Sequence, residues 1–320
     1  MRKVNFYKKL IERIKSVVRA VRVPKSFSKK NNNVFSNEKH IIMSVLMQLE
    51  KKHYRDMPAF LKLLQREIGL KRIPCFSTIN KFVLRIRQSW LEQLIARIVK
   101  SEQTCLVAID GTGFSLNFRS PYFSKVAGEI NRFMQCVASA DVKRKMISAV
   151  RIRRKQRNEN LAVNYLMKQS AKQLKIDYFL ADKLYDSEKN HERAKRYKSK
   201  FIAPLRKKTK QYHRIKGKHR KQLFKSFPRK IYNQRAIIEN IFSVIKRRYG
   251  HIVYSRKFKA QKNELLFRII AYNIEREVNY FEFSVLLYTE PKFSKSFFSI
   301  RIFLNFYCFK IITKLILRVF

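Results

Sequence analysis

Apolar residues recur every three or four positions through the first hundred residues of the chain. This spacing predicts helices over residues 38–52, 57–68 and 77–100. Asn37 is predicted to cap the first of these helices, and Gly69 supplies a stop signal after the second. The segment 35–102 is therefore expected to form an all-α domain.

From Thr104 onward the apolar pattern indicates short strands separated by helices. β-branched and apolar runs predict strands at 104–109, 133–140, 146–153, 177–181 and 200–203. Helical spacing returns at 160–174, 187–198, 232–246 and 264–276. A tight turn at 141–144 makes the second and third strands a hairpin, which favours an antiparallel meander. This β-β-β-α-β-α-β-α order predicts a ribonuclease-H-like α/β fold, a mixed five-stranded sheet with flanking helices.

Charge changes this picture more than any other bulk property. The chain carries 73 Lys and Arg against 22 Asp and Glu, a net charge of +51 at pH 7. A compact fold with this surplus would repel itself unless an anionic partner were bound. Nucleic acid is the favoured partner, and no small-molecule substrate is indicated. A membrane surface and a ribosomal-type basic protein are alternatives; the long apolar helices and 13% aromatic content argue against the second.

The apolar runs and the cysteines indicate in which cellular compartment the protein is expected. No uncharged apolar stretch reaches the roughly 18 residues that a spanning helix needs. Arg and Lys interrupt every apolar run near the N-terminus, so neither a signal peptide nor a membrane span is expected. The cysteines form no C-x-x-C pair or Cys/His cluster. This predicts a reducing cell interior as the compartment and no structural zinc site. A cytoplasmic, nucleoid-associated protein is expected.

Two segments concentrate the positive charge. Residues 1–34 form a basic arm, in which 5–22 fit either a basic amphipathic helix or a partly disordered stretch. Residues 206–230 hold twelve Lys and Arg and no acid, so contact with phosphates is favoured over a merely solvated loop.

The helix that begins at Ser77 follows a short turn and resembles the second helix of a helix-turn-helix. DNA contact by 35–102 is therefore expected, with a simple packing unit as the alternative.

Three carboxylates stand at positions that suit catalysis. Asp110 ends the first predicted strand and precedes Gly-Thr-Gly, which allows close approach of backbone or ligand, and Asp182 ends the fourth strand. Glu239 lies on the helix 232–246. Converging carboxylates repel one another unless divalent cations lie between them, and hard oxygen ligands suit Mg²⁺. Three other aspartates are rivals with structural interpretations, as a hairpin residue, a strand start and a helix N-cap: Asp141, Asp177 and Asp186.

The helix 232–246 carries an unusual set of side chains. Tyr232, Arg235, Glu239 and Lys246 fall at i, i+3, i+7 and i+14, so on a continuous helix all four project from one face. Taken alone, Glu239 could simply be the ion-pair partner of Arg235 at i−4. Together the four offer an aromatic ring, two cations and a carboxylate along one line.

This spacing resembles the Tyr-(2)-Arg-(3)-Glu-(6)-Lys signature of insertion-sequence transposases of the DDE type, complete at all four positions. The context Ile109-Asp110-Gly111-Thr112 resembles the first motif of that family. The context Ala181 to Asp186 resembles the second, with Leu184 where the family commonly has glycine. The resemblance covers residues 35–276.

The resemblance implies a mechanism and partners. Asp110, Asp182 and Glu239 would coordinate two Mg²⁺ or Mn²⁺ ions, which can activate the attacking oxygen and stabilise the leaving one. A water would cleave the transposon end, and the freed 3′-hydroxyl would attack target DNA. The signature residues Tyr232, Arg235 and Lys246 would contact DNA near the scissile phosphate. A homodimer on DNA is expected because two element ends must be joined.

The sequence thus predicts four segments, namely a basic arm (1–34), a helical DNA-binding domain (35–102), a ribonuclease-H-like DDE catalytic domain (103–276) with the basic insertion 206–230, and an atypical basic and aromatic tail (277–320). Two other functions stay open. The protein could be a nuclease of the same fold that cuts without joining, or a non-catalytic DNA-binding remnant of a transposase.

Overall fold

The structure is a computed structural model of the chain and describes residues 2–27, 35–116, 133–154, 157–206 and 212–289. Two compact units are distinguished, residues 1–276 and 277–320. Of the expected tail, residues 277–289 continue the last helix, α13 (Phe258–Thr289), which is longer than the predicted 264–276. Residues 290–320 lie outside the described part of the chain.

The sheet lies within the first unit. Its strands are β1 (Ser101–Ser115), β2 (Phe133–Asp141), β3 (Met146–Arg153), β4 (Leu174–Ala181) and β5 (Lys200–Ile202). Their order in space is β3-β2-β1-β4-β5. The first three strands pair antiparallel, whereas β4 and β5 extend the sheet parallel to β1. The predicted ribonuclease-H-like mixed sheet of five strands is therefore confirmed.

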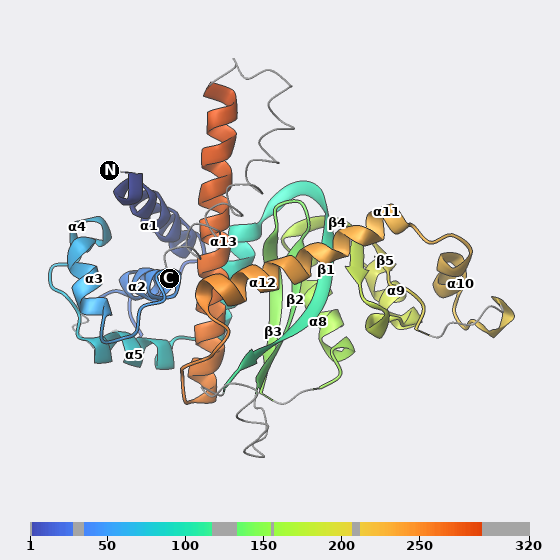
Figure 1. The fold of residues 1–320 in the computed structure, drawn as a ribbon, viewed down its shortest axis with the longest axis horizontal. Coiled ribbons are helices and arrows are strands. Elements are labelled where there is room, and N and C mark those ends of the chain that lie inside the picture. The colour runs from blue at the N-terminus through green and yellow to red at the C-terminus, as the bar shows by residue number, and fades with distance from the viewer. Residues whose placement is uncertain (1, 28–34, 117–132, 155–156, 207–211, 290–320) are drawn as a thin grey trace, which may run out of the picture. The chain divides into compact units, whose positions relative to one another are not determined.

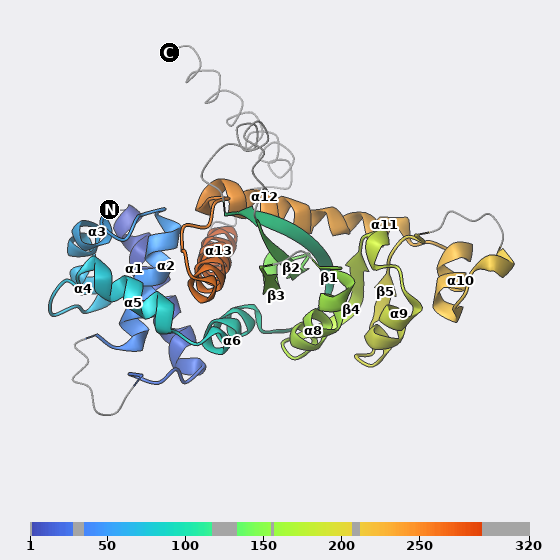
Figure 2. The same ribbon diagram turned by 90° about the horizontal axis from the view of Figure 1, so that it is seen from below.

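Burial accounts for the central place of β1. Val107, Ala108 and Ile109 are each 0% exposed, as expected for a strand covered on both faces. Helix α8 (Asn160–Ala171) packs on β2, β3 and β4, and α12 (Ile237–Tyr249) packs along β1 (Figure 1). Figure 2 shows these two helices on opposite faces of the sheet. The crossover between β4 and β5 is made by α9 (Glu188–Lys195).

The edge strand β3 is closed by α13. The side-chain amide of Asn273 donates to the carbonyl of Ile147 at 2.8 Å and its oxygen accepts from the Ile147 amide at 3.0 Å. Without Asn273, the amide and carbonyl of Ile147 would be unpaired backbone groups on the edge strand. One buried side chain thus replaces a missing sixth strand at this point.

The N-terminal segment is helical. Its helices are α1 (Arg2–Ala20), α2 (Asn37–Leu49), α3 (Met57–Leu63), α4 (Gln65–Ile68), α5 (Phe76–Arg85) and α6 (Gln88–Val99). Helix α1 buries the stripe Leu10, Ile11, Ile14, Val17 and Val18. Of the two alternatives for the basic arm, residues 2–20 therefore adopt the amphipathic helix, because its apolar face has a core to enter.

Three local expectations in this segment are wrong. The predicted helix 77–100 breaks at Ile86, where the side-chain amide of Asn263 donates to the carbonyls of Val83 and Ile86 at 2.8 and 3.2 Å. A distant side chain thus satisfies the helix end, which local spacing does not reveal. The predicted helix 57–68 also breaks, at Leu64.

The cap of α2 also differs from the prediction. Ser36 is the N-cap, and its hydroxyl accepts from the amide of Lys39 at 3.3 Å. Asn37 is instead the first helical residue, is buried, and donates to the carbonyl of Pro24 at 2.9 Å. Two adjacent residues had the right chemistry for a cap, and the tertiary contact of Asn37 decided between them.

The described part of the basic insertion contains a 3₁₀ turn and one short helix, and its last two residues begin α11 (Arg229–Tyr232). A 3₁₀ turn, η2 (Tyr212–Arg214), is followed by α10 (Lys218–Lys225). Residues 207–211 lie outside the described residues. Across the whole described part of the chain, no helix is both long enough and apolar enough to cross a bilayer.

Two buried histidines make stability depend on pH. Burial lowers the pKa values of His40 and His191 from 6.5 to about 4. His40 stacks on Phe82 with ring centroids 4.6 Å apart. A lowered folded-state pKa gives stability that is present above about pH 6.5 and lost as pH falls toward 4.

We expect acidification from pH 7 to 4.5 to destabilise the protein by about 2–3 kcal/mol through His40 alone. The measurement is urea unfolding at both pH values, for wild type and His40→Phe. The variant should lose less stability on acidification. An exposed histidine, in His213→Gln, is the control. An identical loss in His40→Phe and wild type would show that His40 does not titrate in this way.

Candidate active site

Asp110 lies within β1 and not at its end, so the prediction of a strand-end aspartate is wrong here. The strand continues to Ser115 because the residues from Gly111 onward still pair with β2. On its other side, however, β1 has lost its parallel partner. The last pair between β1 and β4 is Ile109 with Ala181. Asp110 is thus the first residue of β1 beyond the end of β4.

Asp182 is the next residue after that last pair, as predicted. Adjacent strands lie about 4.8 Å apart, so the register brings the backbones of Asp110 and Asp182 to neighbouring positions at the sheet. Asp182 opens a 3₁₀ turn, η1 (Lys183–Tyr185), and its carboxylate accepts from the Lys183 amide at 2.6 Å. Leu184 in this turn is 53% exposed and is not among the described residues with positive φ, so the turn does not require glycine there.

Glu239 lies in the first turn of α12, but the expected continuous helix is interrupted. Helix α11 (Arg229–Tyr232) is followed by a 3₁₀ segment, η3 (Asn233–Ala236), before α12 begins. Residues i and i+3 eclipse in 3₁₀ geometry. Tyr232 and Arg235 accordingly stay together, with the guanidinium carbon 6.0 Å from the ring centroid.

Arg235 joins two of the three carboxylates. Its Nη2 donates to Glu239 Oε1 at 2.7 Å, and its Nη1 lies 3.4 Å from Asp110 Oδ2. The ion pair at i−4 that the sequence allowed for Glu239 is present, yet the same guanidinium also reaches the sheet. Arg235 is mostly buried, at 17% side-chain exposure, whereas Glu239 is 55% exposed.

The charge of Asp182 acts on Tyr232, whose ring lies beside Arg235. Burial raises the pKa of the Tyr232 phenol, and the negative charges of Asp182 and Glu239 raise it further while Arg235 lowers it. The phenol is therefore within electrostatic range of both acids. Asp110, Asp182, Glu239, Arg235 and Tyr232 thus gather at one place, where α12 meets the ends of the parallel strands.

Lys246 stands apart from these five residues. It lies over the ring of Phe114, with its ammonium 5.6 Å from the centroid. Burial lowers its pKa. Phe114 is further along β1 than Asp110, so Lys246 lies further along the strand than Arg235, which contacts Asp110.

The surroundings of Asp110 disfavour its ionised form. Burial is the largest cause and raises the pKa of Asp110 to about 6. The Gly111 amide, which donates to the carboxylate at 2.8 Å, and Arg235 lower the pKa, while the charges of Glu159 and Glu239 raise it. A cation placed between these acids would favour the ionised form of Asp110.

Glu159 is a residue that sequence reasoning missed. It precedes α8, accepts from the Tyr185 hydroxyl at 2.5 Å, and lies against Gly111 so closely that an added Cβ would be 2.0 Å from its Oε1. Gly111 is therefore needed for the approach of an acid rather than of a ligand. The glycine after Asp110 signalled a close approach, but nothing in the spacing pointed to Glu159, because it lies 48 positions further along the chain.

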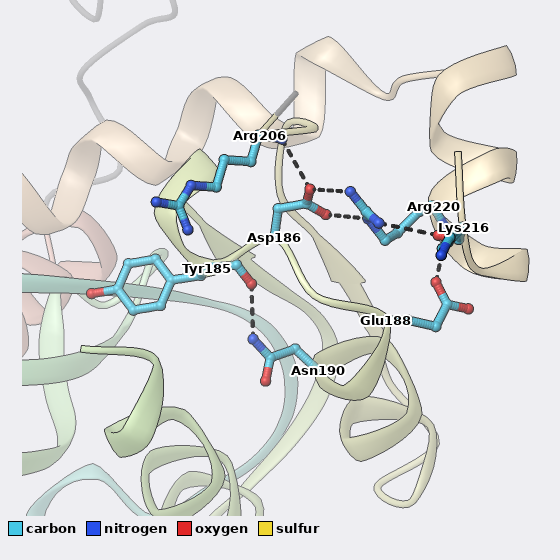
Figure 3. Close-up of polar contacts among 7 residues, drawn as sticks. All are labelled: Tyr185, Asp186, Glu188, Asn190, Arg206, Lys216 and Arg220. Atoms are coloured by element: carbon cyan, nitrogen blue, oxygen red, sulfur yellow. Dashed lines mark hydrogen bonds and ion pairs between the residues drawn. The ribbon is translucent and has the colours of Figure 1, made fainter. Parts of the chain in front are cut away.

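The three rival aspartates have other roles. Asp141 accepts from the amides of Lys143 and Arg144 at 2.9 and 3.2 Å, which confirms its hairpin interpretation. Asp177 lies inside β4, which begins earlier than predicted. Asp186 is not an N-cap, because Ser187 takes that position before α9. Asp186 instead pairs with Arg220 (Figure 3).

The donor set suits a hard divalent cation. Asp110, Asp182, Glu239 and Glu159 offer only carboxylate oxygens, which Mg²⁺ and Mn²⁺ accept. In the part of the chain that the structure describes, no three His, Cys, Asp or Glu side chains are already clustered as a metal site. Arg235 supplies the positive charge between two of the acids. Cation binding would therefore require Arg235 to release Asp110 and Glu239.

Comparison with known proteins finds one family model and several solved structures that match the chain. The family model for the transposase DDE domain matches residues 101–274, which include Asp110, Asp182 and Glu239. No curated protein matches the chain. Among solved structures, the cryo-EM structure of a piggyBac transposase synaptic complex with hairpin DNA aligns with 87% of this chain and 74% of that chain, at 12% identity and a TM-score of 0.45.

Proposed function

This chain belongs to the transposase DDE domain family, and from that premise we propose that it is an insertion-sequence transposase. It would cleave DNA at the element ends and transfer the freed 3′-hydroxyl into target DNA. The observation that carries the proposal is the guanidinium of Arg235, which joins Asp110 on the central strand to Glu239 on α12. Asp182 stands at the neighbouring strand end.

In this proposal Asp110, Asp182 and Glu239 hold two Mg²⁺ or Mn²⁺ ions. Such ions, when bound, activate the attacking oxygen and stabilise the leaving one. The protein's own part is to keep the three carboxylates on rigid elements. Two of them follow the last residue pair of parallel strands, and the third is fixed by the packing of α12 on β1.

Arg235 and Tyr232 would contact DNA near the scissile phosphate. A guanidinium released from Asp110 and Glu239 presents a planar fork that matches two phosphate oxygens. Arg235 would thus exchange carboxylates for phosphate as substrate and cations enter together. Lys246 would contact the backbone further along, consistent with its distance along α12.

The N-terminal helices would bind the element ends. Within 35–102, helix α5 follows α4 after the connection 69–75, and α5 would take the expected helix-turn-helix role in contacting DNA. Helix α1 buries its apolar stripe, and Lys8 on its exposed side would contact phosphates. A homodimer on DNA remains part of the proposal because two ends must be brought together.

A strand-transfer assay tests this function. The protein would be incubated with Mg²⁺ or Mn²⁺, a DNA carrying the element's own ends and a supercoiled target. Joined products are expected. Nicked ends without joined products would identify the alternative, a nuclease of the same fold. Tight binding with neither product would indicate a non-catalytic remnant.

Glu159 is proposed as a fourth acid of this site. Glu159→Gln keeps an acceptor for the Tyr185 hydroxyl but removes the charge beside Asp110. We expect Mn²⁺ to bind about 10-fold more weakly to this variant. Electron paramagnetic resonance of free Mn²⁺, without DNA, measures this. The exposed acid of Glu102→Gln is the matched control. Unchanged affinity in Glu159→Gln would exclude the residue from the cation site.

A further inference from the structure

Helix α10, in the basic insertion, is held to the catalytic unit on one side. Glu188, at the start of α9, accepts from the backbone amides of His219 and Arg220 at 2.9 and 3.2 Å, and from the ring of His219 at 2.8 Å. A carboxylate at this position satisfies unpaired amides and complements the helix dipole. Gly217 allows the contact, because an added Cβ would lie 2.1 Å from Glu188 Oε2.

A buried ion pair makes the second attachment. Arg220 donates through Nε and Nη2 to the two oxygens of Asp186 at 2.8 and 2.7 Å, and the Arg206 amide donates to the same carboxylate at 2.9 Å (Figure 3). The Asp186 side chain is only 1% exposed. Asp186 directly follows the 3₁₀ turn that Asp182 opens. The insertion is therefore fastened to the turn that carries a candidate catalytic residue.

The other side of α10 carries lysines. Lys218, Lys221 and Lys225 fall at i, i+3 and i+7 and share one face, opposite to Arg220. They span about 10 Å along the helix. Lys221 and Lys225 also lie over the ring of Tyr212, with their ammonium groups 5.4 and 4.8 Å from its centroid. The sequence from 206 to 230 contains no acid that could neutralise this face.

We propose that this lysine face, Lys218, Lys221 and Lys225, binds the phosphate backbone of the DNA that enters the active site, and that the Asp186–Arg220 pair sets its position relative to Asp182. Duplex DNA offers a phosphate on each strand about every 3.4 Å along its axis, so the face can follow about three phosphates of one strand. The inference rests on the proposed function, in that the same DNA is bound and cut.

The anchor matters because α10 is short. Its eight residues are fewer than the roughly 12–15 that an isolated helix needs to persist in water. Without Asp186 and Glu188, the helix would have to be ordered during DNA binding, which weakens affinity. Anchoring therefore preorganises the lysines for a backbone of fixed geometry.

The first test compares two triple variants by fluorescence anisotropy of a labelled duplex across a salt series. Lys218→Gln/Lys221→Gln/Lys225→Gln should lower the slope of log affinity against log salt by about 2.7, since each phosphate contact contributes about 0.9. The control triple neutralises exposed lysines near the start of β4, at the opposite end of that strand from Asp182: Lys168, Lys172 and Lys175. Equal slopes in the two triples would overturn the proposal.

The second test separates anchoring from charge. Asp186→Asn makes the protein more positive, so charge alone predicts tighter DNA binding. If the Asp186–Arg220 pair anchors α10, Asp186→Asn should instead bind DNA about tenfold more weakly than wild type. Arg220→Met should also bind more weakly. Unchanged or tighter binding by Asp186→Asn would overturn the anchoring role. Binding is measured without cleavage, so the two claims can fail separately. If the variants change binding as expected but the wild type never nicks DNA, the proposed function is refuted and this inference is not.

Discussion

Replacing Glu239 by Gln is expected to abolish metal-dependent cleavage of DNA while leaving DNA binding intact. The substitution keeps the size of the side chain and its acceptor for Arg235, but removes the charge that a divalent cation requires. A loss on the order of 10³-fold or more is expected, because the charge acts on the transition state directly. Asp110→Asn and Asp182→Asn should act in the same way.

Nicking of end-bearing DNA with Mg²⁺ or Mn²⁺ measures this loss, and anisotropy measures binding on the same samples. Binding should be equal or tighter, since a carboxylate that repels phosphate has been removed. Glu192→Gln, an exposed acid on α9, is the matched control and should cleave normally. Any of the three variants that still cleaves at the wild-type rate would lose its assignment to the cation site.

Replacing Arg268 by Met is expected to destabilise the protein by about 3–5 kcal/mol. Arg268 is 2% exposed and donates to Glu264 at 2.5 Å, to the carbonyls of Gly250 and Ile252 at 2.9 and 2.7 Å, and to Gln48 at 3.2 Å. Methionine would fill the space but remove the donor to the two carbonyls and to Gln48, and it would leave the buried Glu264 with only the backbone amides of Tyr254 and Ser255 as donors. The effect should extend to the active site because Ile252 bridges to Ser115 at the end of β1.

Urea unfolding at pH 7 measures this destabilisation. The double variant Arg268→Met/Glu264→Gln should recover part of the loss, because it no longer buries an unpaired carboxylate. Arg247→Met is the control, since Arg247 is exposed. A loss below about 1 kcal/mol in Arg268→Met would mean that water replaces the guanidinium at its acceptors.

The candidate site shows how far local pattern can lead. The apolar run before Asp182 located that residue at a strand end, and Ala181, the last residue of that run, pairs with Ile109, the residue before Asp110. The pattern could not show that β1 continues past Asp110, because the continuation depends on pairing with β2. It also predicted one helix from Tyr232 to Lys246, where a 3₁₀ segment interrupts the path.

Other residues acquired their roles only through contacts with distant parts of the chain. Asp186 has the sequence context of an N-cap, but its partner Arg220 is 34 residues away. Glu159 has no signal of its own and is placed by Gly111 and Tyr185. Arg235 has an acid at i+4, which the sequence predicts, and a second one 125 residues away, which it does not.

The sequence by itself determined the order of strands and helices, the mixed sheet, the positive charge and the candidates Asp110, Asp182 and Glu239, since each depends on periodicity, composition or short spacing. The tertiary structure alone decided where β1 ends, which acids share Arg235, and how α10 is anchored. These outcomes depend on packing between segments far apart in the chain, and local periodicity carries no information about that packing.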